Sequence, residues 1–155
     1  MNNCVYFSKV GEFIREEDQT ILNQLCENFK KLTGEEPDNG QIEAWKGMIP
    51  HLKKLFSSIN KDIYLVMEYK LPFSNRRIDL LLFGKDSNDK NTILVFELKG
   101  WSQVEIDNKN SNIVKVGQNE YLHPELQLLS YSSAIKYYHS CGNDFSVVGV
   151  IWAYN

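Results

Sequence analysis

The 155-residue sequence has few cysteines and no long apolar run. Its three cysteines, Cys4, Cys26 and Cys141, are odd in number, far apart and not at zinc-ligand spacing from a histidine, so we expect neither a disulfide framework nor a zinc site. No apolar stretch approaches the length of a bilayer span, which excludes a transmembrane protein. Residues 1–15 lack the basic and apolar regions of a secretory signal, so the sequence predicts a cytoplasmic location and no membrane partner.

Basic residues do not outnumber acidic ones in this sequence. There are 17 Lys and Arg against 20 Asp and Glu, a net charge of −3, which excludes a polybasic protein that binds nucleic acid through its whole surface. Any contact with nucleic acid must therefore use a local groove. The apolar fraction of 43% excludes a disordered chain, and the length predicts a single domain.

Apolar periodicity predicts helices in the first part of the chain and strands in the second. Pro50 should kink or restart the second helix, and the polar residues 101–121 predict a long loop. The predicted helices cover 12–32, 41–59 and 124–139, and the predicted strands cover 63–70, 76–84, 92–99 and 145–152.

This order predicts an α/β fold with a mixed central sheet flanked by helices. The first three strands have short connections and should form an antiparallel meander, whereas the last strand follows a crossover helix and should lie parallel to a neighbour. Residues 1–40 would be a helical extension and residues 41–155 the core of one domain. Because the sequence stops directly after the last strand, we expect a longer natural chain of which this domain is the N-terminal part.

Carboxylates interrupt two otherwise apolar strands. Asp79 lies within the second strand, and Glu97 and Lys99 lie near the end of the third. Residues two apart in a strand share a face, and Asp79 on the neighbouring strand can reach them. A buried unpaired carboxylate is costly, so these acids need a partner. The cluster therefore predicts either a Mg²⁺ or Mn²⁺ site or an ordinary salt bridge at the sheet end.

The motif Arg77-Ile78-Asp79, followed eighteen residues later by Glu97-Leu98-Lys99, resembles that of the PD-(D/E)xK (restriction-endonuclease-like) nuclease superfamily. The family core runs helix, three strands, helix, strand, and residues 41–152 are predicted in that order. Ile78 replaces the usual proline, a departure common in the family. The resemblance implies that Asp79, Glu97 and the Leu98 carbonyl bind Mg²⁺ (or Mn²⁺), and that Lys99 is the catalytic lysine.

A second motif lies on the helix that opens at His123-Pro124. Gln127 and Tyr131 are four residues apart, so they share one helical face. RecB-type members of the superfamily carry such a Q-x-x-x-Y pair, and the resemblance implies that both residues reach the site. Without the family, Tyr131 could be a core residue and Gln127 a surface residue.

Glu68 is the candidate for a third acid. Its E-Y-x-L-P segment resembles that of nuclease-like domains at the N-terminus of certain bacterial helicases, which also carry a glutamine and a tryptophan on the preceding helix, here Gln41 and Trp45. The resemblance implies a helicase or ATPase domain in the same longer chain or complex. Glu43 on the first core helix is the alternative third acid, and Glu68 could also be a solvated acid at a strand end.

Candidate nucleic-acid contacts flank these motifs. Arg76 and Arg77 precede Asp79 and could contact phosphate or pair with a nearby acid. Lys109 and Lys115 could follow a nucleic-acid backbone or belong to an ordinary solvated loop. Among the tryptophans, Trp45 and Trp152 are expected in the core, and Trp101 could be either a core residue or a stacking platform.

The predicted function is therefore a metal-dependent nuclease domain that hydrolyses phosphodiester bonds, with DNA a better candidate substrate than RNA. The alternative is a catalytically silent nucleic-acid-binding or coupling module of a helicase-type machine. A protein-interaction domain whose acids make only salt bridges is a third possibility.

Overall fold

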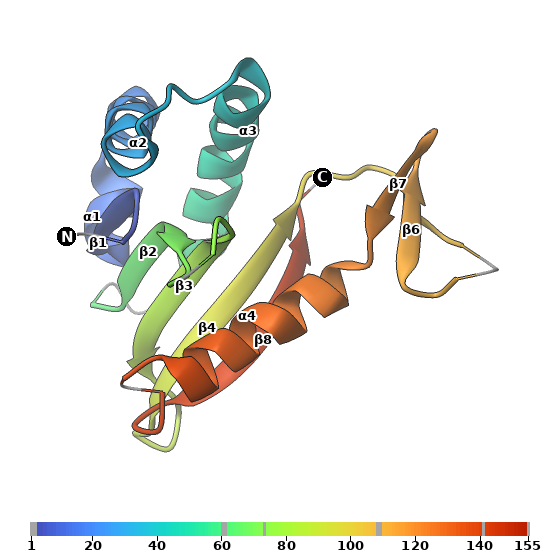
Figure 1. Cartoon of the computed structure of the whole chain (residues 1–155). Coiled ribbons are helices and arrows are strands. Elements are labelled where there is room, and N and C mark those ends of the chain that lie inside the picture. Colours follow the sequence, from blue (N-terminus) through green and yellow to red (C-terminus); the bar gives the residue numbers. More distant parts are fainter. Residues whose placement is uncertain (1–2, 60–61, 73, 108–109, 141, 155) are drawn as a thin grey trace.

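The computed structural model describes residues 3–59, 62–72, 74–107, 110–140 and 142–154. Figure 1 shows helices packed on a mixed five-stranded sheet, from which a small three-stranded sheet extends. The main sheet contains β1 (Tyr6–Lys9), β2 (Tyr64–Lys70), β3 (Arg77–Lys85), β4 (Asn91–Lys99) and β8 (Ser146–Ala153), in that order. The small sheet contains β5 (Glu105–Ile106), β6 (Ile113–Val116) and β7 (Asn119–Leu122), and the helices are α1 (Val10–Arg15), α2 (Asp18–Thr33), α3 (Asn39–Phe56) and α4 (Pro124–Tyr138).

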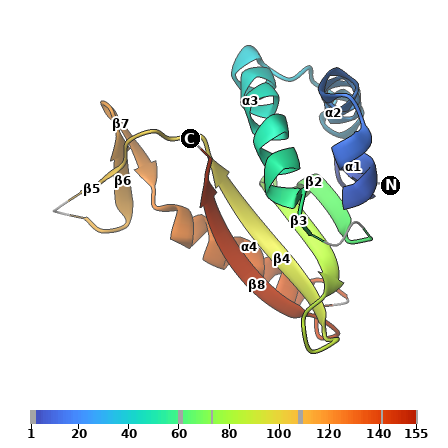
Figure 2. The same cartoon turned by 180° about the vertical axis from the view of Figure 1, so that it is seen from behind.

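The predicted mixed α/β architecture is confirmed. Strands β2, β3 and β4 form the antiparallel meander, and β8 lies parallel to β4 after the crossover through α4. Helix α4 connects β7 to β8 and covers one face of the sheet. It lies in front of β4 and β8 in Figure 1 and behind them in Figure 2. Among the described residues, no helix has both the length and the apolar character needed to cross a membrane.

The helix prediction for the N-terminal region was wrong in detail. The helix expected over 12–32 is two helices, because Glu16 and Glu17 both have extended backbone between them, with ψ of 150° and 140°. The residues before α1 form β1, which pairs antiparallel with β2, so the first forty residues also supply an edge strand. Helix α3 continues through Pro50, which lies on the exposed side of the helix.

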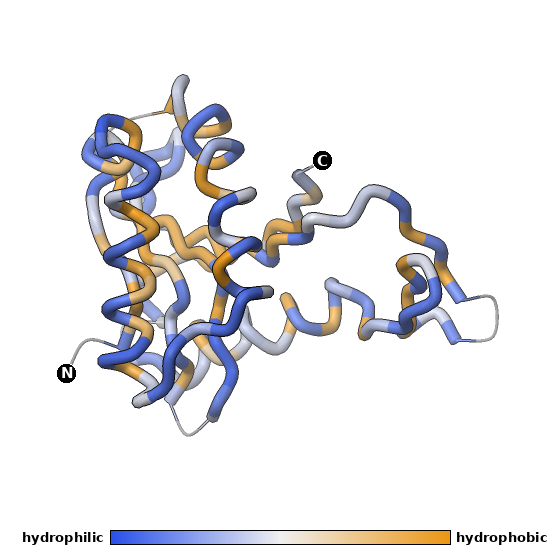
Figure 3. Tube along the Cα trace, turned by 90° about the horizontal axis from the view of Figure 1, so that it is seen from above, coloured by the Kyte–Doolittle hydropathy of each residue, from blue (hydrophilic) through white to orange (hydrophobic). Residues whose placement is uncertain are grey.

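The segment 101–121 was predicted as a loop but contains β5, β6 and β7. Val114 on β6 is 2% exposed, so this hairpin-like sheet has a small buried side of its own. Figure 3 shows the segment extending away from the main body. Its strands have two to four residues, too short for the alternation of apolar and polar side chains to be recognised in the sequence.

The middle of β3 is covered on both faces of the sheet, which explains its nearly continuous apolar run. Leu80 and Leu82 pack with α1, α2 and α3 on one face, and Leu81 packs with α4 on the other. We refer to these as the three-helix face and the α4 face. Polar side chains within these strands therefore lie between two apolar layers, where each needs a specific partner.

Candidate functional site

Three acids lie in a row across β2, β3 and β4. The pairs in register are Met67 with Leu80 and Tyr69 with Ile78 between β2 and β3, and Leu80 with Phe96 between β3 and β4. One step along these ladders aligns Glu68 with Asp79, and Asp79 with Glu97. The sheet thus brings together, at one end, the three acids on which the sequence prediction depends.

Glu68 belongs to a closed hydrogen-bond network. One carboxylate oxygen accepts from Gln41 Nε2 at 3.3 Å and from Trp45 Nε1 at 3.0 Å, and the other accepts from Arg77 Nε at 2.8 Å. The Arg77 guanidinium also lies 4.8 Å from the centre of the Phe29 ring. Because both oxygens have donors and the residue is 7% exposed, Glu68 joins β2 to α3, and its negative charge also raises the pKa of Asp79.

The backbone explains this orientation. Glu68 has a φ of +53°, in the left-handed region that residues other than glycine rarely adopt. On β2, Met67 lies on the three-helix face and Val66 on the α4 face, so regular alternation would send Glu68 to the α4 face. The left-handed residue reverses that alternation and turns the carboxylate toward Trp45.

Asp79 is held by the neighbouring strand. Its Oδ2 accepts the backbone N–H of Leu98 at 2.8 Å, which fixes the carboxylate beside β4. Burial and the negative charge of Glu97 together raise the pKa of Asp79 from 3.8 to about 7, with a smaller contribution from the charge of Glu68, whereas the Leu98 hydrogen bond and the charge of Lys99 act in the opposite direction. Ionised Asp79 is therefore costly unless a positive charge is nearby.

Glu97 is buried and incompletely satisfied. Its Oε1 lies 2.6 Å from Lys99 Nζ, and its side chain is 2% exposed. Its Oε2 is buried and has no hydrogen-bond partner among the described residues. Burial raises the pKa of Glu97, although Lys99 opposes the shift. A buried oxygen without a partner is rare in native proteins and marks a position where a further group can bind.

Helix α4 contributes Tyr131 and Gln127 to the same neighbourhood. Tyr131 is 6% exposed. Burial raises the pKa of the Tyr131 hydroxyl first, followed by the charges of Glu97 and Asp79, and a side-chain hydrogen bond with Gln127 lowers it. The negative charges of Glu97 and Asp79 thus act on the Tyr131 hydroxyl. Arg76, which also acts on Tyr131, is exposed and donates to Ser130 Oγ at 3.4 Å.

Lys99 links the acids to the small sheet. Its ammonium lies 5.0 Å from the centre of the Trp101 ring, and that ring lies 5.3 Å from the Tyr121 ring on β7. Trp101 therefore packs beside the site instead of in the main core. Trp45 is 1% exposed and Trp152 packs partly against the three-helix core, as predicted for both.

Other predicted residues lie apart from the acids. Glu43 is exposed and pairs with Lys46 at 2.6 Å. Lys115 lies 3.6 Å from both Asp107 and Glu120, so two acids already neutralise it. Lys109 lies outside the described residues, and so does Cys141. The structure thus separates Glu43 and Lys115 from the group formed by Asp79, Glu97 and Lys99.

Sequence reasoning missed Tyr154. Burial raises the pKa of its hydroxyl, and the charge of Asp79 raises it further. Its backbone N–H donates to the Lys99 carbonyl at 3.1 Å, and a Cβ on Gly100 would lie 3.0 Å from its hydroxyl oxygen. The glycine after Lys99 thus leaves room for this tyrosine, and it is the one sequence signal that could have pointed to a close approach there.

The donor set fits a divalent cation bound by two carboxylates. Among the described residues, no three His, Cys, Asp or Glu side chains are grouped so that they could hold a metal ion. Mg²⁺, however, usually binds through one or two carboxylates and keeps several waters. Asp79 and the Glu97 oxygen that lacks a partner among the described residues supply such a pair, whereas the oxygens of Glu68 already accept hydrogen bonds from Gln41, Trp45 and Arg77.

Comparisons of the chain with protein-family models, with curated proteins and with solved structures gave no match. A function is therefore inferred from the geometry of the acids and from the motifs that carry them.

Proposed function

We propose that this chain is a divalent-metal-dependent nuclease domain of restriction-endonuclease-like type, and that it hydrolyses phosphodiester bonds, in DNA more readily than in RNA. The observation that carries the proposal is half-buried Asp79 next to buried Glu97, with Lys99 beside Glu97 and one Glu97 oxygen that has no partner among the described residues. The order of β2, β3, β4, α4 and β8 agrees with the core that the motif resemblance implies. Nucleic acid in the cytoplasm is the proposed substrate.

Asp79 and Glu97 would hold Mg²⁺ or Mn²⁺, with the Leu98 carbonyl as the further ligand that the resemblance implies. When bound, such an ion polarises a phosphate oxygen and lowers the pKa of a water molecule. The hydrogen bond from Leu98 N–H keeps Asp79 in place, and the Lys99 ion pair keeps Glu97 in place. The protein therefore positions both carboxylates before any ligand arrives.

Lys99 would stabilise negative charge that develops on the phosphate. Its ammonium is held between the Glu97 carboxylate, at 2.6 Å, and the Trp101 ring, at 5.0 Å from the ring centre, so it is oriented in advance. The Tyr131 hydroxyl and the Gln127 amide would bind the substrate from the α4 side. Exposed Arg76 would contact a flanking phosphate, whereas Arg77 is committed to Glu68.

One observation favours the second candidate, a silent binding or coupling module of a helicase-type machine. The 2.6 Å ion pair between Lys99 and Glu97 neutralises part of the site without any metal. Such a pair can be purely structural. Turnover of a nucleic-acid substrate separates the two candidates.

A metal titration combined with a plasmid-nicking assay tests the proposal. Mn²⁺ should raise the melting temperature of the wild type, because an ion that binds only the folded state stabilises it by mass action. Asp79→Ala and Glu97→Ala should lose most of this rise and should not nick plasmid. Glu43→Ala, which removes an exposed carboxylate, is the matched control and should behave as wild type. Equal metal-induced shifts in all four proteins would place the ion elsewhere and refute the proposed site.

A further inference from the structure

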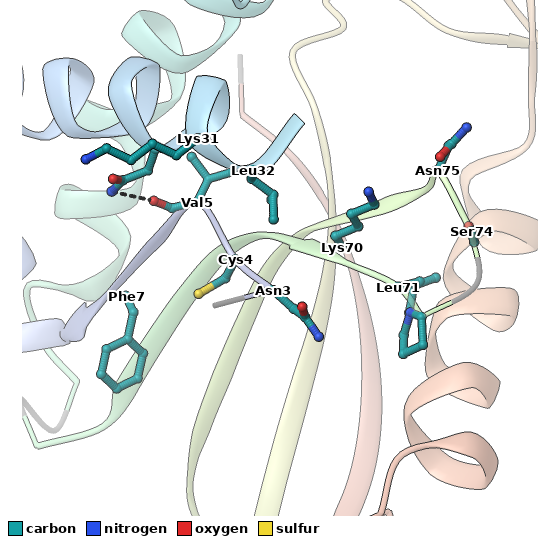
Figure 4. A pocket seen from close by; sticks show the side chains of 12 residues that line it. Asn3, Cys4, Val5, Phe7, Lys31, Leu32, Lys70, Leu71, Ser74 and Asn75 are labelled. Atoms are coloured by element: carbon teal, nitrogen blue, oxygen red, sulfur yellow. Dashed lines mark hydrogen bonds between the residues drawn. The ribbon is translucent and has the colours of Figure 1, made fainter. Parts of the chain in front are cut away.

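The most spacious cavity that we describe lies beside the acids, not on them. It has a volume of about 850 Å³, within the range of about 300–1,000 Å³ typical of ligand sites. Figure 4 shows that its lining comes from the chain around β1, the last turn of α2 and the turn between β2 and β3. In this view Phe7 lies on one side of the lining and Asn75 on the other. We call it the β1 groove.

The charge of the β1 groove is opposite to that of the chain. Lys31 and Lys70 line it, together with amide side chains of Asn3, Asn28 and Asn75, and no Asp or Glu is present among the described residues of the lining. Lys31 pairs with exposed Glu27 at 2.7 Å at the rim, whereas no described carboxylate lies within ion-pair distance of Lys70. In a chain of net charge −3, this groove is a local site for an anion.

A second cavity adjoins the β1 groove at the turn between β2 and β3. It has a volume of about 510 Å³, shares Leu71, Pro72 and Ser74 with the first, and is lined by Arg76 but by no described Asp or Glu. The charge of Arg76 lowers the pKa of Tyr131, which the charges of Asp79 and Glu97 raise. Arg76, Lys70 and Lys31 are thus the basic residues that line these two adjoining cavities. Asp79 is three residues after Arg76, about 10 Å along an extended chain.

The far end of the groove carries exposed aromatic rings. Phe7 is 60% exposed and its ring is stacked on that of Tyr64, with centroids 5.6 Å apart and planes 7° apart. Tyr64 is itself 44% exposed. An aromatic face open to solvent can stack on an unpaired base, whereas the bases of a duplex already cover one another's faces. The aromatic pair therefore favours a single strand over a duplex.

From these observations we propose that the β1 groove binds single-stranded nucleic acid, with phosphates along Arg76, Lys70 and Lys31 and a base on Phe7. The assignment names the substrate of the acid site and so rests on the proposed function. In that combination, the single strand passes over the β2–β3 turn and reaches Asp79 and Glu97 from the groove side.

Fluorescence anisotropy in metal-free buffer with EDTA tests binding without cleavage. The probe is a fluorescein-labelled single-stranded DNA of about 15 nucleotides, matched to the site sizes of single-strand binders. Lys70→Gln should weaken binding about fivefold at 0.1 M salt and lower the slope of log affinity against log salt by about 0.7. Lys90→Gln removes the same charge at the opposite end of β3 and should change neither quantity.

Phe7 provides the test of strandedness. Phe7→Ala should weaken single-strand binding by at least about fivefold and leave binding of the matching duplex unchanged. Phe7→Leu keeps an apolar side chain, so its failure to restore affinity would tie the effect to the ring. Equal losses for single strand and duplex, or competition by free dTMP at the concentration at which the oligonucleotide competes, would overturn the single-strand assignment.

The outcomes separate this proposal from the proposed function. Wild type that binds the oligonucleotide with the expected variant pattern but cleaves neither plasmid nor the single-stranded oligonucleotide when Mn²⁺ is added would refute the nuclease and keep the groove. Wild type that cleaves while Lys70→Gln, Lys31→Gln and Phe7→Ala bind as wild type would refute the groove and keep the nuclease.

Discussion

Glu68 and Glu97 are buried glutamates at the same level of one sheet, with β3 between them. Three donors reach the two oxygens of Glu68, and the residue accepts a left-handed backbone to meet them. Glu97 has one ion pair and one buried oxygen without a partner among the described residues. Both glutamates are thus buried, but Glu68 has more polar partners than Glu97. The satisfied acid holds β2 against α3, and the unsatisfied one is available to a ligand.

Removing the satisfied acid should have the largest effect. Glu68→Ala leaves Arg77 and the Trp45 N–H without their acceptor inside the protein. The alanine must also adopt the left-handed backbone conformation of Glu68. We expect a loss of about 3–5 kcal/mol in the free energy of unfolding, measured by urea denaturation. Glu43→Ala, an exposed glutamate on α3, should change stability by less than about 0.5 kcal/mol. Equal stability of the two variants would show that the Glu68 network is not structural.

Lys99→Ala should affect chemistry more than folding. Removing the oriented ammonium should raise the activation free energy of plasmid nicking by about 3–4 kcal/mol, the cost of losing one donor that stabilises charge in a transition state. Metal binding should survive or tighten, because a nearby positive charge repels a cation. Lys99→Arg should rescue only part of the rate, since a planar guanidinium does not replace a compact ammonium. Unchanged nicking by Lys99→Ala would favour the silent coupling module.

The acid pair should also make stability depend on pH. The folded-state pKa of Asp79 is raised to about 7, so the folded chain holds this proton more tightly than the unfolded chain does. The contribution of Asp79 to the free energy of unfolding is present at low pH and is lost as the pH rises from about 4 through 7. It amounts to about 1.4 kcal/mol for each unit by which the pKa is raised.

Melting temperatures of wild type and Asp79→Asn between about pH 5 and pH 8 measure this difference. The variant keeps an acceptor for Leu98 N–H but cannot ionise, so its melting temperature should fall less than that of the wild type. Asp144→Asn, an exposed position, is the control. Parallel curves for wild type and Asp79→Asn would contradict a raised pKa.

The smallest effect is expected on α4. Gln127 is only partly buried, so Gln127→Ala should leave the melting temperature nearly unchanged. If its amide binds the substrate, cleavage should slow about fivefold, the value of one hydrogen bond of about 1 kcal/mol. Tyr131→Phe keeps the ring and tests the hydroxyl separately. If both variants melt at lower temperature but cleave at the wild-type rate, Gln127 and Tyr131 contribute to packing alone.

Much of the fold could be predicted because it follows from periodicity. The meander of β2, β3 and β4 and the parallel return of β8 were recognised from strand spacing and from the crossover rule. Asp79, Glu97 and Lys99 were recognised because each interrupts an apolar strand. The break between α1 and α2 was missed because Glu16 and Glu17 carry no helix-breaking signal of the kind that glycine or proline provides.

The orientation of Glu68 could not be predicted from its position in β2. Alternation places it on the α4 face, and only its left-handed backbone, which no glycine marks, sends it to Trp45. The pairing of β1 with β2 and the contact of Tyr154 with the end of β4 depend on tertiary packing in the same way. Sequence therefore identified the acids but not which of them was already occupied.

The crossover through α4 also sets the order in which the site is assembled during synthesis. The β2–β4 meander has short connections and can form from local contacts, whereas β8 pairs Ser146 with Thr92, 54 residues earlier in the chain. Asp79, Glu97 and Lys99 are therefore synthesised before Gln127 and Tyr131. A nascent chain carries the charged groups of the site while the α4 side is still missing, and the two halves meet after the last strand of the sheet has been added.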